Sequence, residues 1–419
     1  MSIDSTTSRR LRRRLLPLHA AVLLQGVALW VPVEKLFMTE IGFDAASVGV
    51  MAAIYAAVVP VIEIPSGILA DRWSRRGVLI VANVALLVSV LIGGLSNSVT
   101  TYFIAAMVLG VFFAMNSGTM DSVVYDTVLE ETGDSGDFER RIGRIRLMDS
   151  IALVTSALAG GWLAMSTSTR LTYFLTAPFV ALSVVALLAF REPRLHNAVE
   201  ATSLRSHITT TYRTILDRGR LLPIATLMVL TALLLQVLLE FGPLWLVALA
   251  APAIFYGPHF AGLTSALGLG GLLAGRLRFT HPATLAAVVA LMVLSSVTLA
   301  LSHDAIVVTV AQVMLALLVV AASIFLTRLL HDAVPSAVRS GVASGVGALS
   351  WIAFLPFALI FGVVTERAGV HTAGWMITAA TVLAGALLMM LGLDRRVGDP
   401  AEPVVAVEPE AASVAPMDL

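Results

Sequence analysis

The stretch Glu63-Ile-Pro-Ser-Gly-Ile-Leu-Ala-Asp-Arg-Trp-Ser-Arg-Arg76 lies where a long apolar run ends in a cluster of charge. If this stretch is helical, Glu63, Gly67 and Asp71 at i, i+4 and i+8 form one polar, small-residue stripe on an apolar helix. The glycine allows a neighbouring helix to approach closely. The arginines that follow favour water and anionic headgroups, so they hold this end of the helix at one side of a membrane. The stretch therefore predicts a membrane helix, a tight turn and a charge cluster with the character of a gate.

The composition of the whole chain is that of a membrane protein. Of its 419 residues, 58% are hydrophobic and 13% are charged, and the mean hydropathy is +0.91. Soluble globular domains are less apolar and carry about 25% charged residues. The net charge is zero, so the overall charge identifies no partner. We therefore expect an integral membrane protein that has the lipid bilayer as a partner and binds no nucleic acid.

Residue types that are missing or rare exclude several kinds of chemistry. The chain has no cysteine, which excludes disulfides, thiolate metal sites and cysteine nucleophiles. Its only lysine is Lys35, so a Walker A loop, whose lysine reaches the phosphates, cannot exist. The histidines, from His19 to His371, lack the spacing of a zinc hydrolase. We expect no metal, no cofactor and no ATPase domain in this chain.

Long apolar runs predict how often the chain crosses the membrane, because one crossing needs about 20 apolar residues. Twelve such runs lie at 15–38, 45–70, 76–96, 100–129, 142–166, 170–190, 221–249, 252–275, 281–301, 304–333, 338–365 and 371–393. Both termini are then on one side, and that side carries 24 of the 27 basic residues, all except Lys35, Arg170 and Arg367. By the positive-inside rule, both termini are predicted to be cytoplasmic and the protein to span the cytoplasmic membrane.

The two halves of the chain repeat. Leu15-Leu16-Pro17 opens the first crossing as Leu221-Leu222-Pro223 opens the seventh, and the same offset pairs Glu34 with Glu240. Repeats of this kind are typical of secondary transporters. The predicted segments are a basic cytoplasmic tail (1–14), a six-helix bundle (15–190), a cytoplasmic linker (191–220), a second six-helix bundle (221–393) and a disordered cytoplasmic tail (394–419).

The linker over 191–220 allows two interpretations. Ile208, Tyr212, Ile215 and Leu216 repeat at helical spacing beside several arginines, which is typical of a helix that lies on the membrane surface. A solvated linker explains the same composition equally well.

The opening stretch resembles the signature loop of the major facilitator superfamily, Gly-x-x-x-Asp-Arg-x-Gly-Arg-Arg. The matching residues are Gly67, Asp71, Arg72, Arg75 and Arg76, and Ser74 replaces the second glycine. The segment 117–128 resembles a branch with Glu-Ile-Pro-Ser/Thr-Gly in helix two and Asp-x-x-x-Tyr-Asp in helix four, described as drug or metabolite exporters. Two features depart from proton-coupled relatives: residues 100–125 contain no arginine, and the helix-five motif Gly-Pro-x-x-Gly-Gly is reduced to Ser156-Ala157-Leu-Ala-Gly160-Gly161.

The resemblance implies an all-α integral membrane fold of twelve helices in two pseudo-symmetric six-helix bundles. It also implies that the loop after helix two meets helix eleven, near Arg339, when the cytoplasmic side is closed. A carboxylate is favoured at a helix N-terminus, so Asp71 is the expected gate residue.

Charged side chains inside the membrane are candidate functional residues, because each costs about 2.5–3.5 kcal/mol at bilayer depth. Asp121, expected to be partly desolvated, is the first candidate for carrying a proton, with structural hydrogen bonding as the alternative. Glu34 and Glu240 either line a cavity or anchor their helices at the outer membrane face. Glu63 serves either a gate or helix packing. Lys35 follows Glu34, but adjacent residues point apart on a helix, so it need not neutralise this carboxylate.

A second set of charges is expected to form a structural network at the cytoplasmic helix ends. Its members are Asp126, Arg144, Arg146, Arg328, Asp332 and Arg339. The partners expected for Asp126 are Arg144, Arg146 or Arg72.

These features together predict a secondary active transporter and not an enzyme. The leading hypothesis is a proton-coupled exporter, or antiporter, of a small amphipathic organic molecule, acting as a monomer by alternating access. An importer or facilitator of a nutrient is the alternative within the same fold. A membrane enzyme acting on lipids, or a receptor, is a remote alternative, because the histidines do not form a catalytic cluster.

Overall fold

The computed structural model describes residues 5–116, 119–133, 138–193, 221–274, 276–333 and 339–393. The rest of the predicted linker and the predicted C-terminal tail lie outside these residues. So do five side chains that the sequence singles out, those of Gly67, Asp71, Arg72, Asp332 and Arg339, although their backbone belongs to helices.

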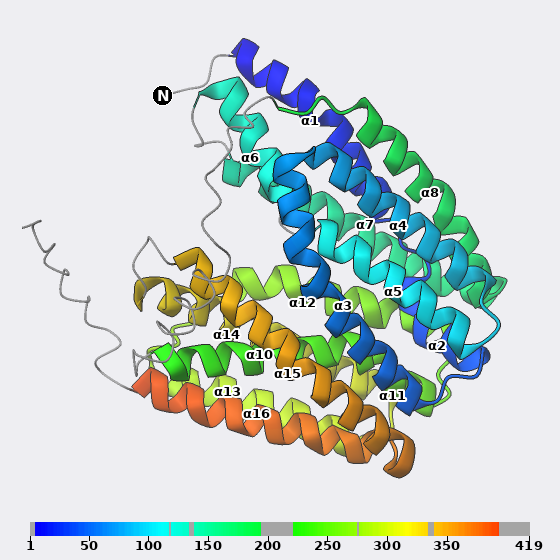
Figure 1. Cartoon of the computed structure of the whole chain (residues 1–419). Helices are drawn as coiled ribbons and strands as arrows, with labels where there is room; N and C mark the ends of the chain where they lie inside the picture. The colour runs from blue at the N-terminus through cyan, green and yellow to red at the C-terminus, as the bar shows by residue number, and fades with distance from the viewer. Residues whose placement is uncertain are drawn as a thin grey trace, which may run out of the picture.

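Every regular element of the described residues is a helix (Figure 1). The N-terminal half contains α1 (Ser5–Gln25), η1 (Val31–Val33), α2 (Glu34–Glu40), α3 (Ala45–Arg72), α4 (Arg75–Leu95), α5 (Val99–Asn116), α6 (Thr119–Thr132), α7 (Phe138–Ser166) and α8 (Thr169–Ala189). The C-terminal half contains α10 (Leu221–Phe241), α11 (Pro243–Ala248), η2 (Ala253–Phe255), α12 (Tyr256–Ala274), α13 (Pro282–Leu301), α14 (Ala305–Ala333), α15 (Arg339–Ala368) and α16 (Val370–Leu393). The predicted all-α membrane fold is confirmed.

Ten helical spans of the described residues are long and apolar enough to cross a membrane. The other two predicted crossings are α1, which is rich in arginine near its start, and α12, which contains several glycines. Large apolar side chains such as Leu182, Val185 and Ile306 are exposed on the outer helix faces. In a bilayer such faces contact lipid chains, so their exposure is expected for this class of protein.

The first crossing differs from the uninterrupted helix predicted over 15–38. Helix α1 already begins at Ser5, so arginines assigned to the tail belong to it, and it ends at Gln25. A Cβ on Gly26 would lie 2.8 Å from the Cβ of Ala152, so a glycine is needed where this chain segment packs against α7. The path then continues through η1 into α2.

The seventh crossing is broken in a similar way. Helix α10 ends at Phe241, and Pro243 opens the short helix α11 after Gly242. Proline suits the first turn of a helix because its missing N–H has no partner there. Each half therefore places a short helix, α2 or α11, at the same end of the molecule, and the two short helices contact each other.

Side-chain caps set the starts of several helices. Asp44 caps α3 by accepting hydrogen bonds from the hydroxyl and the amide of Ser47, at 2.6 and 2.7 Å. These hydrogen bonds lower the pKa of Asp44. Ser74 caps α4 and Ser168 caps α8 through the same kind of bond. These caps fix where α3, α4 and α8 begin, and the start of α4 carries one of the charged clusters described below.

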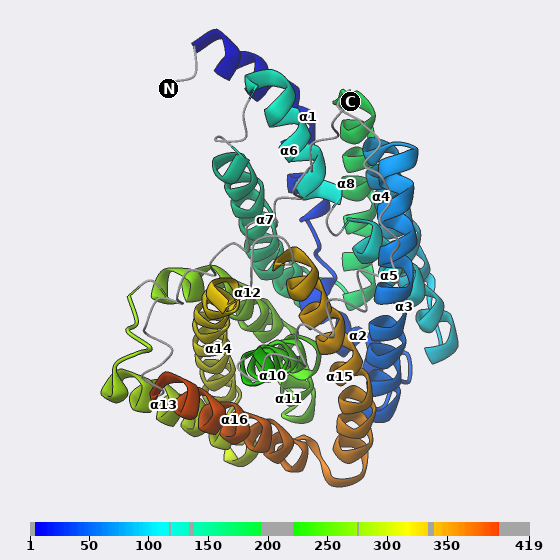
Figure 2. The same cartoon turned by 60° about the vertical axis from the view of Figure 1, so that its left-hand side comes forward.

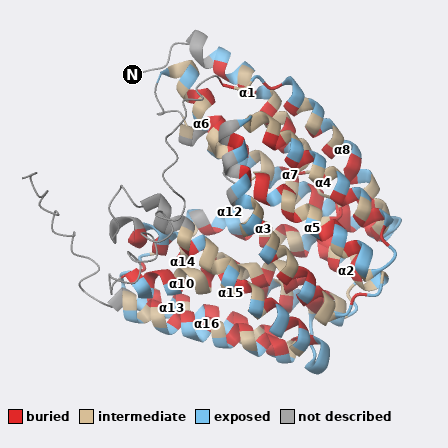
Figure 3. Ribbon diagram, viewed as in Figure 1, coloured by how far each residue is buried: buried red, intermediate tan, exposed pale blue. Residues whose placement is uncertain are grey.

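The two halves form separate bundles that touch at one end and diverge toward the other (Figures 1 and 2). Buried residues gather inside each bundle and where the bundles meet (Figure 3). We call the end that carries α2 and α11 the joined end, and the end where α1 begins the divergent end. The halves meet mainly through α3 with α15 and through α7 with α12.

Glycines allow these helix pairs to cross closely. A Cβ on Gly49 of α3 would lie 2.6 Å from the carbonyl oxygen of Ala358 in α15. A Cβ on Gly161 of α7 would lie 2.8 Å from the amide nitrogen of Gly257 in α12. Small residues of this kind let membrane helices approach until their backbones touch. Tight backbone contact therefore closes the joined end.

Candidate functional site

The joined end holds a buried charged triad of Glu34, Lys35 and Glu240. The ammonium of Lys35 lies 3.0 Å from Oε2 of Glu34 and also pairs with Oε1 of Glu240. The Lys35 side chain is 3% exposed, and the two carboxylates are 16% and 21% exposed. Because Glu34 and Lys35 belong to α2 and Glu240 to α10, the triad links the two halves of the molecule.

The triad corrects the expectation for Lys35. Adjacent residues point apart in a regular helix, but α2 begins at Glu34, directly after the 3₁₀ turn of η1. At this first turn both long side chains reach the same space, so Lys35 pairs with its neighbour as well as with Glu240.

Aromatic side chains from α5 and α8 complete the surroundings of Glu34. The hydroxyl of Tyr102 donates to Oε1 of Glu34 at 2.8 Å and lies 2.8 Å from the hydroxyl of Tyr173. Trp30 stacks on Tyr173 with 5.2 Å between ring centroids, and the ring of Phe37 lies 4.9 Å from that of Tyr173. Glu34 therefore accepts hydrogen bonds from both Lys35 and a buried phenol.

A small cavity lies beside these groups. It measures about 10 Å³ and is lined by Glu34, Tyr102, Tyr173 and Trp30 together with residues of α4 and α5. A space of this size is close to the minimum that holds one water molecule. The cavity beside Glu34 therefore has room for a single water molecule.

The energetics of the triad depend on its burial. A buried ion pair adds little net stability, because desolvation offsets the attraction, but removal of one partner costs about 3–5 kcal/mol. With both carboxylates ionised, the three groups sum to one negative charge. A single added proton makes the cluster neutral. The arrangement can therefore hold or release one proton without leaving an isolated buried positive charge.

Asp121, the first sequence candidate, lies elsewhere, on α6 toward the divergent end. Its carboxylate accepts a hydrogen bond from Nη2 of Arg146 at 3.0 Å. The side chains of Asp121 and Arg146 are 45% and 71% exposed. The carboxylate is therefore less desolvated than the sequence suggested, because the other half of the molecule does not cover α6 at this depth (Figure 1).

Glu63 is also exposed and does not join the triad. It lies on α3, and its backbone carbonyl accepts a hydrogen bond from the hydroxyl of Ser66 at 2.9 Å. The same hydroxyl lies 3.2 Å from the carbonyl oxygen of Ala114, so it ties α3 to α5.

The described part of the signature loop is bonded within its own half. Arg75 forms an ion pair with Asp126 and donates to the carbonyl oxygen of Ser122 at 3.2 Å. Asp126 therefore pairs with Arg75, which was not among its predicted partners, because the start of α4 reaches α6 directly. Arg76 donates from Nη1 to the carbonyl oxygen of Phe190 at 3.0 Å.

Glu192 completes this arrangement and was not singled out in the sequence. Its carboxylate accepts hydrogen bonds from the Ser74 hydroxyl at 2.5 Å and from the amide nitrogens of Arg75 and Arg76 at 2.5 and 3.3 Å. A carboxylate is stabilised at the N-terminus of a helix such as α4. Its position just after a predicted crossing was the available signal, but the partner helix start lies more than a hundred residues earlier.

Two further residues of the predicted network, Arg144 and Arg328, lie on helices of different halves. Arg144 is exposed on α7. Arg328 is exposed on α14, with its guanidinium carbon 5.6 Å from the centroid of the Phe325 ring. Asp332 and Arg339 lie outside the described side chains, as do Gly67, Asp71 and Arg72 of the loop.

The C-terminal half has a buried polar cluster of its own, which sequence reasoning missed. Nε2 of His259 lies 2.7 Å from Oε1 of Gln312, and Nε2 of Gln312 donates to the carbonyl oxygen of Gly242 at 3.2 Å. The cluster joins α12, α14 and the break between α10 and α11. It holds the backbone at the point where the seventh crossing is interrupted.

The fold and the site together define a polytopic membrane protein of two helical bundles with a charged contact between them. A sequence model of the Major Facilitator Superfamily matches residues 18–351, and the chain belongs to this family. It therefore has the twelve-helix transporter fold of that superfamily, and it is a transporter and not an enzyme.

Several solved structures share the fold. The nucleoside transporter NupG superposes with a TM-score of 0.74 at 13% identity, covering 91% of this chain and 98% of that one. A bacterial homologue of the human lysosomal transporter Spinster, in an inward-facing and unoccupied conformation, gives a TM-score of 0.72 at 13% identity, with 94% and 98% covered. The xylose transporter XylE from E. coli, in an inward-open conformation, gives 0.66 at 13% identity, with 90% and 95% covered.

One curated relative matches part of the sequence. Multidrug resistance protein 1 of Bacillus subtilis (strain 168) is 25% identical over 169 residues. The match covers 40% of this chain and 42% of the relative, so the comparison extends over about two fifths of each protein.

Proposed function

We propose that this transporter is a proton-coupled exporter of a small amphipathic organic molecule that works by alternating access. The observation that carries the proposal is the buried triad, in which Lys35 joins a carboxylate of one half to a carboxylate of the other. The partial match to a protein named for multidrug resistance supports the direction and the kind of substrate.

The triad offers a physical route from protonation to conformational change. A proton on Glu240 removes its charge and weakens its attraction to Lys35, which is an interaction between the two halves. Loss of the proton restores the pair. A ligand or proton shifts a conformational equilibrium only by its differential affinity for the two states. Glu240 binds a proton more readily when the joined end is open, because Lys35 then no longer stabilises its negative charge. Protonation therefore favours opening of the joined end.

Asp121 keeps a secondary place in this proposal. Its carboxylate is paired with an exposed arginine of the same half, so its protonation does not act directly on the contact between halves. Asp71 serves as a gate at the divergent end when α3 and α15 approach each other there, and Arg339 begins α15 at that end.

The proposal includes an orientation and an assembly state. Both termini face the cytoplasm of a cytoplasmic membrane, and the chain acts as a monomer. Support comes from the 24 basic residues, 27 less Lys35, Arg170 and Arg367, that this orientation places inside. In this orientation the divergent end faces the cytoplasm, and the arrangement of the halves is inward-facing.

The test uses purified protein in proteoliposomes with an imposed pH gradient and a fluorescent amphipathic cation as the probe. We expect probe movement against its gradient, loss of that movement with a protonophore, and loss with Glu240→Gln. The matched control is Glu366→Gln, because Glu366 also bridges the halves at the joined end, accepting a hydrogen bond from the Ala45 amide at 3.0 Å. The control should retain coupled transport.

Two results would contradict the proposal. Probe movement that is indifferent to the protonophore rejects proton coupling. Movement of the probe only down its own gradient, with or without a pH gradient, favours a facilitator of the same fold.

A further inference from the structure

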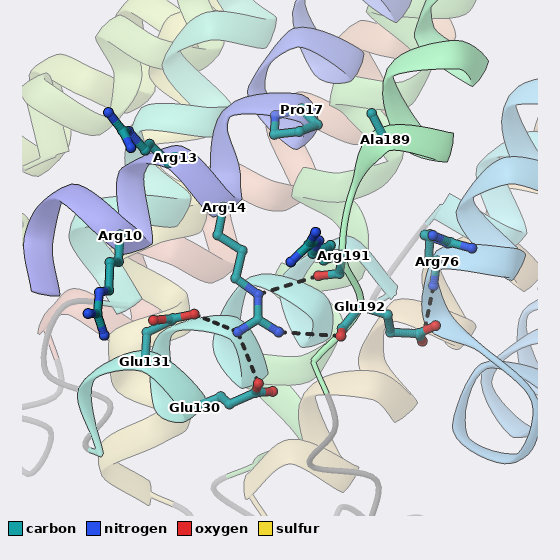
Figure 4. Close-up of a pocket in the computed structure, with 10 residues that line it drawn as sticks. All are labelled: Arg10, Arg13, Arg14, Pro17, Arg76, Glu130, Glu131, Ala189, Arg191 and Glu192. Carbon is teal, nitrogen blue, oxygen red and sulfur yellow. Dashed lines mark hydrogen bonds and ion pairs between the residues drawn. The ribbon is translucent and has the colours of Figure 1, made fainter.

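A cavity lined mostly by charged side chains lies far from the triad, on the N-terminal half at the divergent end. Its volume is about 850 Å³, and its walls come from α1, α4, α6 and the segment that follows α8 (Figure 4). Five arginines line it, namely Arg10, Arg13, Arg14, Arg76 and Arg191. Three glutamates, Glu130, Glu131 and Glu192, also line it.

Each of the three glutamates has ion-pair or hydrogen-bond partners within the protein. Nη1 of Arg14 lies 3.0 Å from Oε1 of Glu130 and 2.7 Å from Oε1 of Glu131. Glu192 accepts hydrogen bonds from Ser74 and from the first amides of α4. All three carboxylates are therefore engaged, and the five arginines of the lining outnumber them by two.

Three of the arginines have guanidinium groups that are free to bind an anion. Arg10, Arg13 and Arg191 are exposed, and within the described part of the chain no hydrogen bond or ion pair engages their guanidinium groups. Figure 4 shows Arg10 and Arg191 on opposite sides of Arg14. A guanidinium fork presents several donors in the geometry that matches phosphate oxygens. The pocket therefore presents an excess of positive charge with free donors.

The floor of the pocket is a fixed structure. Arg14, whose side chain is 15% exposed, also donates to the carbonyl oxygens of Arg191 and Glu192, at 3.4 and 3.3 Å. One guanidinium thus binds α6 and the segment after α8 to α1. A ligand would meet a surface that is already organised, which reduces the entropy lost on binding.

Apolar side chains border the pocket. Pro17 of α1 and Ala189 of α8 line it, and their neighbours Leu16 and Leu188 are 62% and 57% exposed. These leucines lie on outer faces of membrane-crossing helices, next to the charged helix ends. A ligand with a phosphate at headgroup depth and hydrocarbon chains below it satisfies both surfaces.

We propose that this pocket binds the phosphate-bearing headgroup of an anionic phospholipid. Arg10, Arg13 and Arg191 contact the phosphate oxygens, and the acyl chains run along Leu16 and Leu188. Arg14 positions the pocket and is not available to the ligand. The site does not depend on the transported substrate or on the direction of transport.

The experiment measures phosphatidylglycerol binding to the full-length protein in detergent by native mass spectrometry. The triple variant Arg10→Gln, Arg13→Gln, Arg191→Gln removes the free donors. The matched control is Arg276→Gln, Arg278→Gln, Arg328→Gln, which removes three exposed arginines from the other half. At about fivefold per basic group near an anionic surface, we expect the triple variant to bind about 100-fold more weakly. The control should bind within about twofold of the parent protein.

Three outcomes would overturn the inference. Equal weakening by the two triple variants assigns the effect to general surface charge. Equal binding of zwitterionic phosphatidylcholine removes the anion selectivity. Displacement of the lipid by millimolar inorganic phosphate assigns the pocket to a free anion. Should the triple variant fail to fold, Arg191→Gln alone, a single change on an exposed side chain, carries the same test.

Discussion

The contact between Gly161 and Gly257 makes a sharp prediction about conformational state. A Cβ added at Gly161 would lie 2.8 Å from the amide nitrogen and 3.0 Å from the Cα of Gly257, and 3.3 Å from the carbonyl oxygen of Ala253. All three atoms belong to the backbone of the other half, so no side chain can rotate away. Gly161→Ala therefore forces α7 and α12 apart. The distance from the new Cβ to the amide nitrogen of Gly257 must grow from 2.8 Å to the 3.4 Å of an ordinary contact.

The size of the effect follows from the cost of overpacking, about 1–3 kcal/mol. This cost arises only while the joined end is closed, so it changes the ratio of the two states by about 5- to 150-fold in favour of opening. Replacing glycine by alanine also favours a helix by about 1 kcal/mol, but that gain is common to both states. Gly143→Ala, in the same helix, has no atom within 4 Å of its added Cβ, so it carries the helix gain without the clash.

The assay uses the absence of cysteine in the chain. Cysteines introduced at Thr100 and Ala368, both exposed at the joined end and one in each half, carry spin labels, and electron–electron double resonance measures their separation. We expect Gly161→Ala to increase the population with a long separation relative to Gly143→Ala. The reasoning is refuted if both variants give the same distance distribution. It is also refuted if Gly161→Ala lowers thermal stability but leaves the distance distribution unchanged, because the contact then does not distinguish the states.

Three further predictions concern charge. Lys35→Met leaves two buried carboxylates without their cation and should lower the free energy of unfolding by about 3–5 kcal/mol. Thermal unfolding should show partial recovery of stability when Glu240→Gln is added. No recovery would mean that Lys35 and Glu240 are not coupled. Asp71→Asn should slow turnover with little change in substrate affinity and increase labelling of single cysteines at the divergent end; unchanged turnover and labelling would leave the signature loop as a topological anchor only. Reporter fusions after Arg170 and after Arg396 should report opposite sides of the membrane, and fusions on the same side would contradict the twelve-helix topology.

Hydropathy was sufficient for the crossings because a membrane helix must satisfy its backbone internally and present apolar side chains to lipid. The predicted start at residue 221 coincides with the start of α10. The breaks after Gln25 and after Phe241 were not predicted, because the residues that follow are as apolar as those in a continuous helix. At the first break Gly26 packs closely against α7, a contact between segments distant in sequence.

The sequence identified carboxylates of the charged site but not the residues with which they pair. The repeat offset brought attention to Glu34 and Glu240, and the structure places both in one triad. Their shared partner Lys35 was misjudged because the rule for adjacent residues assumes a regular helix, whereas α2 begins there. Tyr102 reaches Glu34 across 68 residues of sequence, and no local pattern identifies such a partner.

The distribution of the ion pairs shows where coupling can arise. Among the ion pairs between described residues, those of Arg14, Arg75 and Arg146 join helices of the N-terminal half, and only the pair of Lys35 with Glu240 joins the two halves. If each half moves largely as a unit, pairs within a half persist in both states and contribute equally to each.

A contribution that is equal in both states cannot shift their populations, whatever its strength. Titration of the pair that crosses between the halves removes an attraction that exists only in the joined state, so it changes the free-energy difference between the states. For this reason Glu240, in an ion pair between the halves, is a stronger candidate for proton coupling than a carboxylate paired within its own half or an exposed one such as Glu366. The burial of Lys35 adds to this argument, because a charge is sensitive to its partner only where water does not screen it.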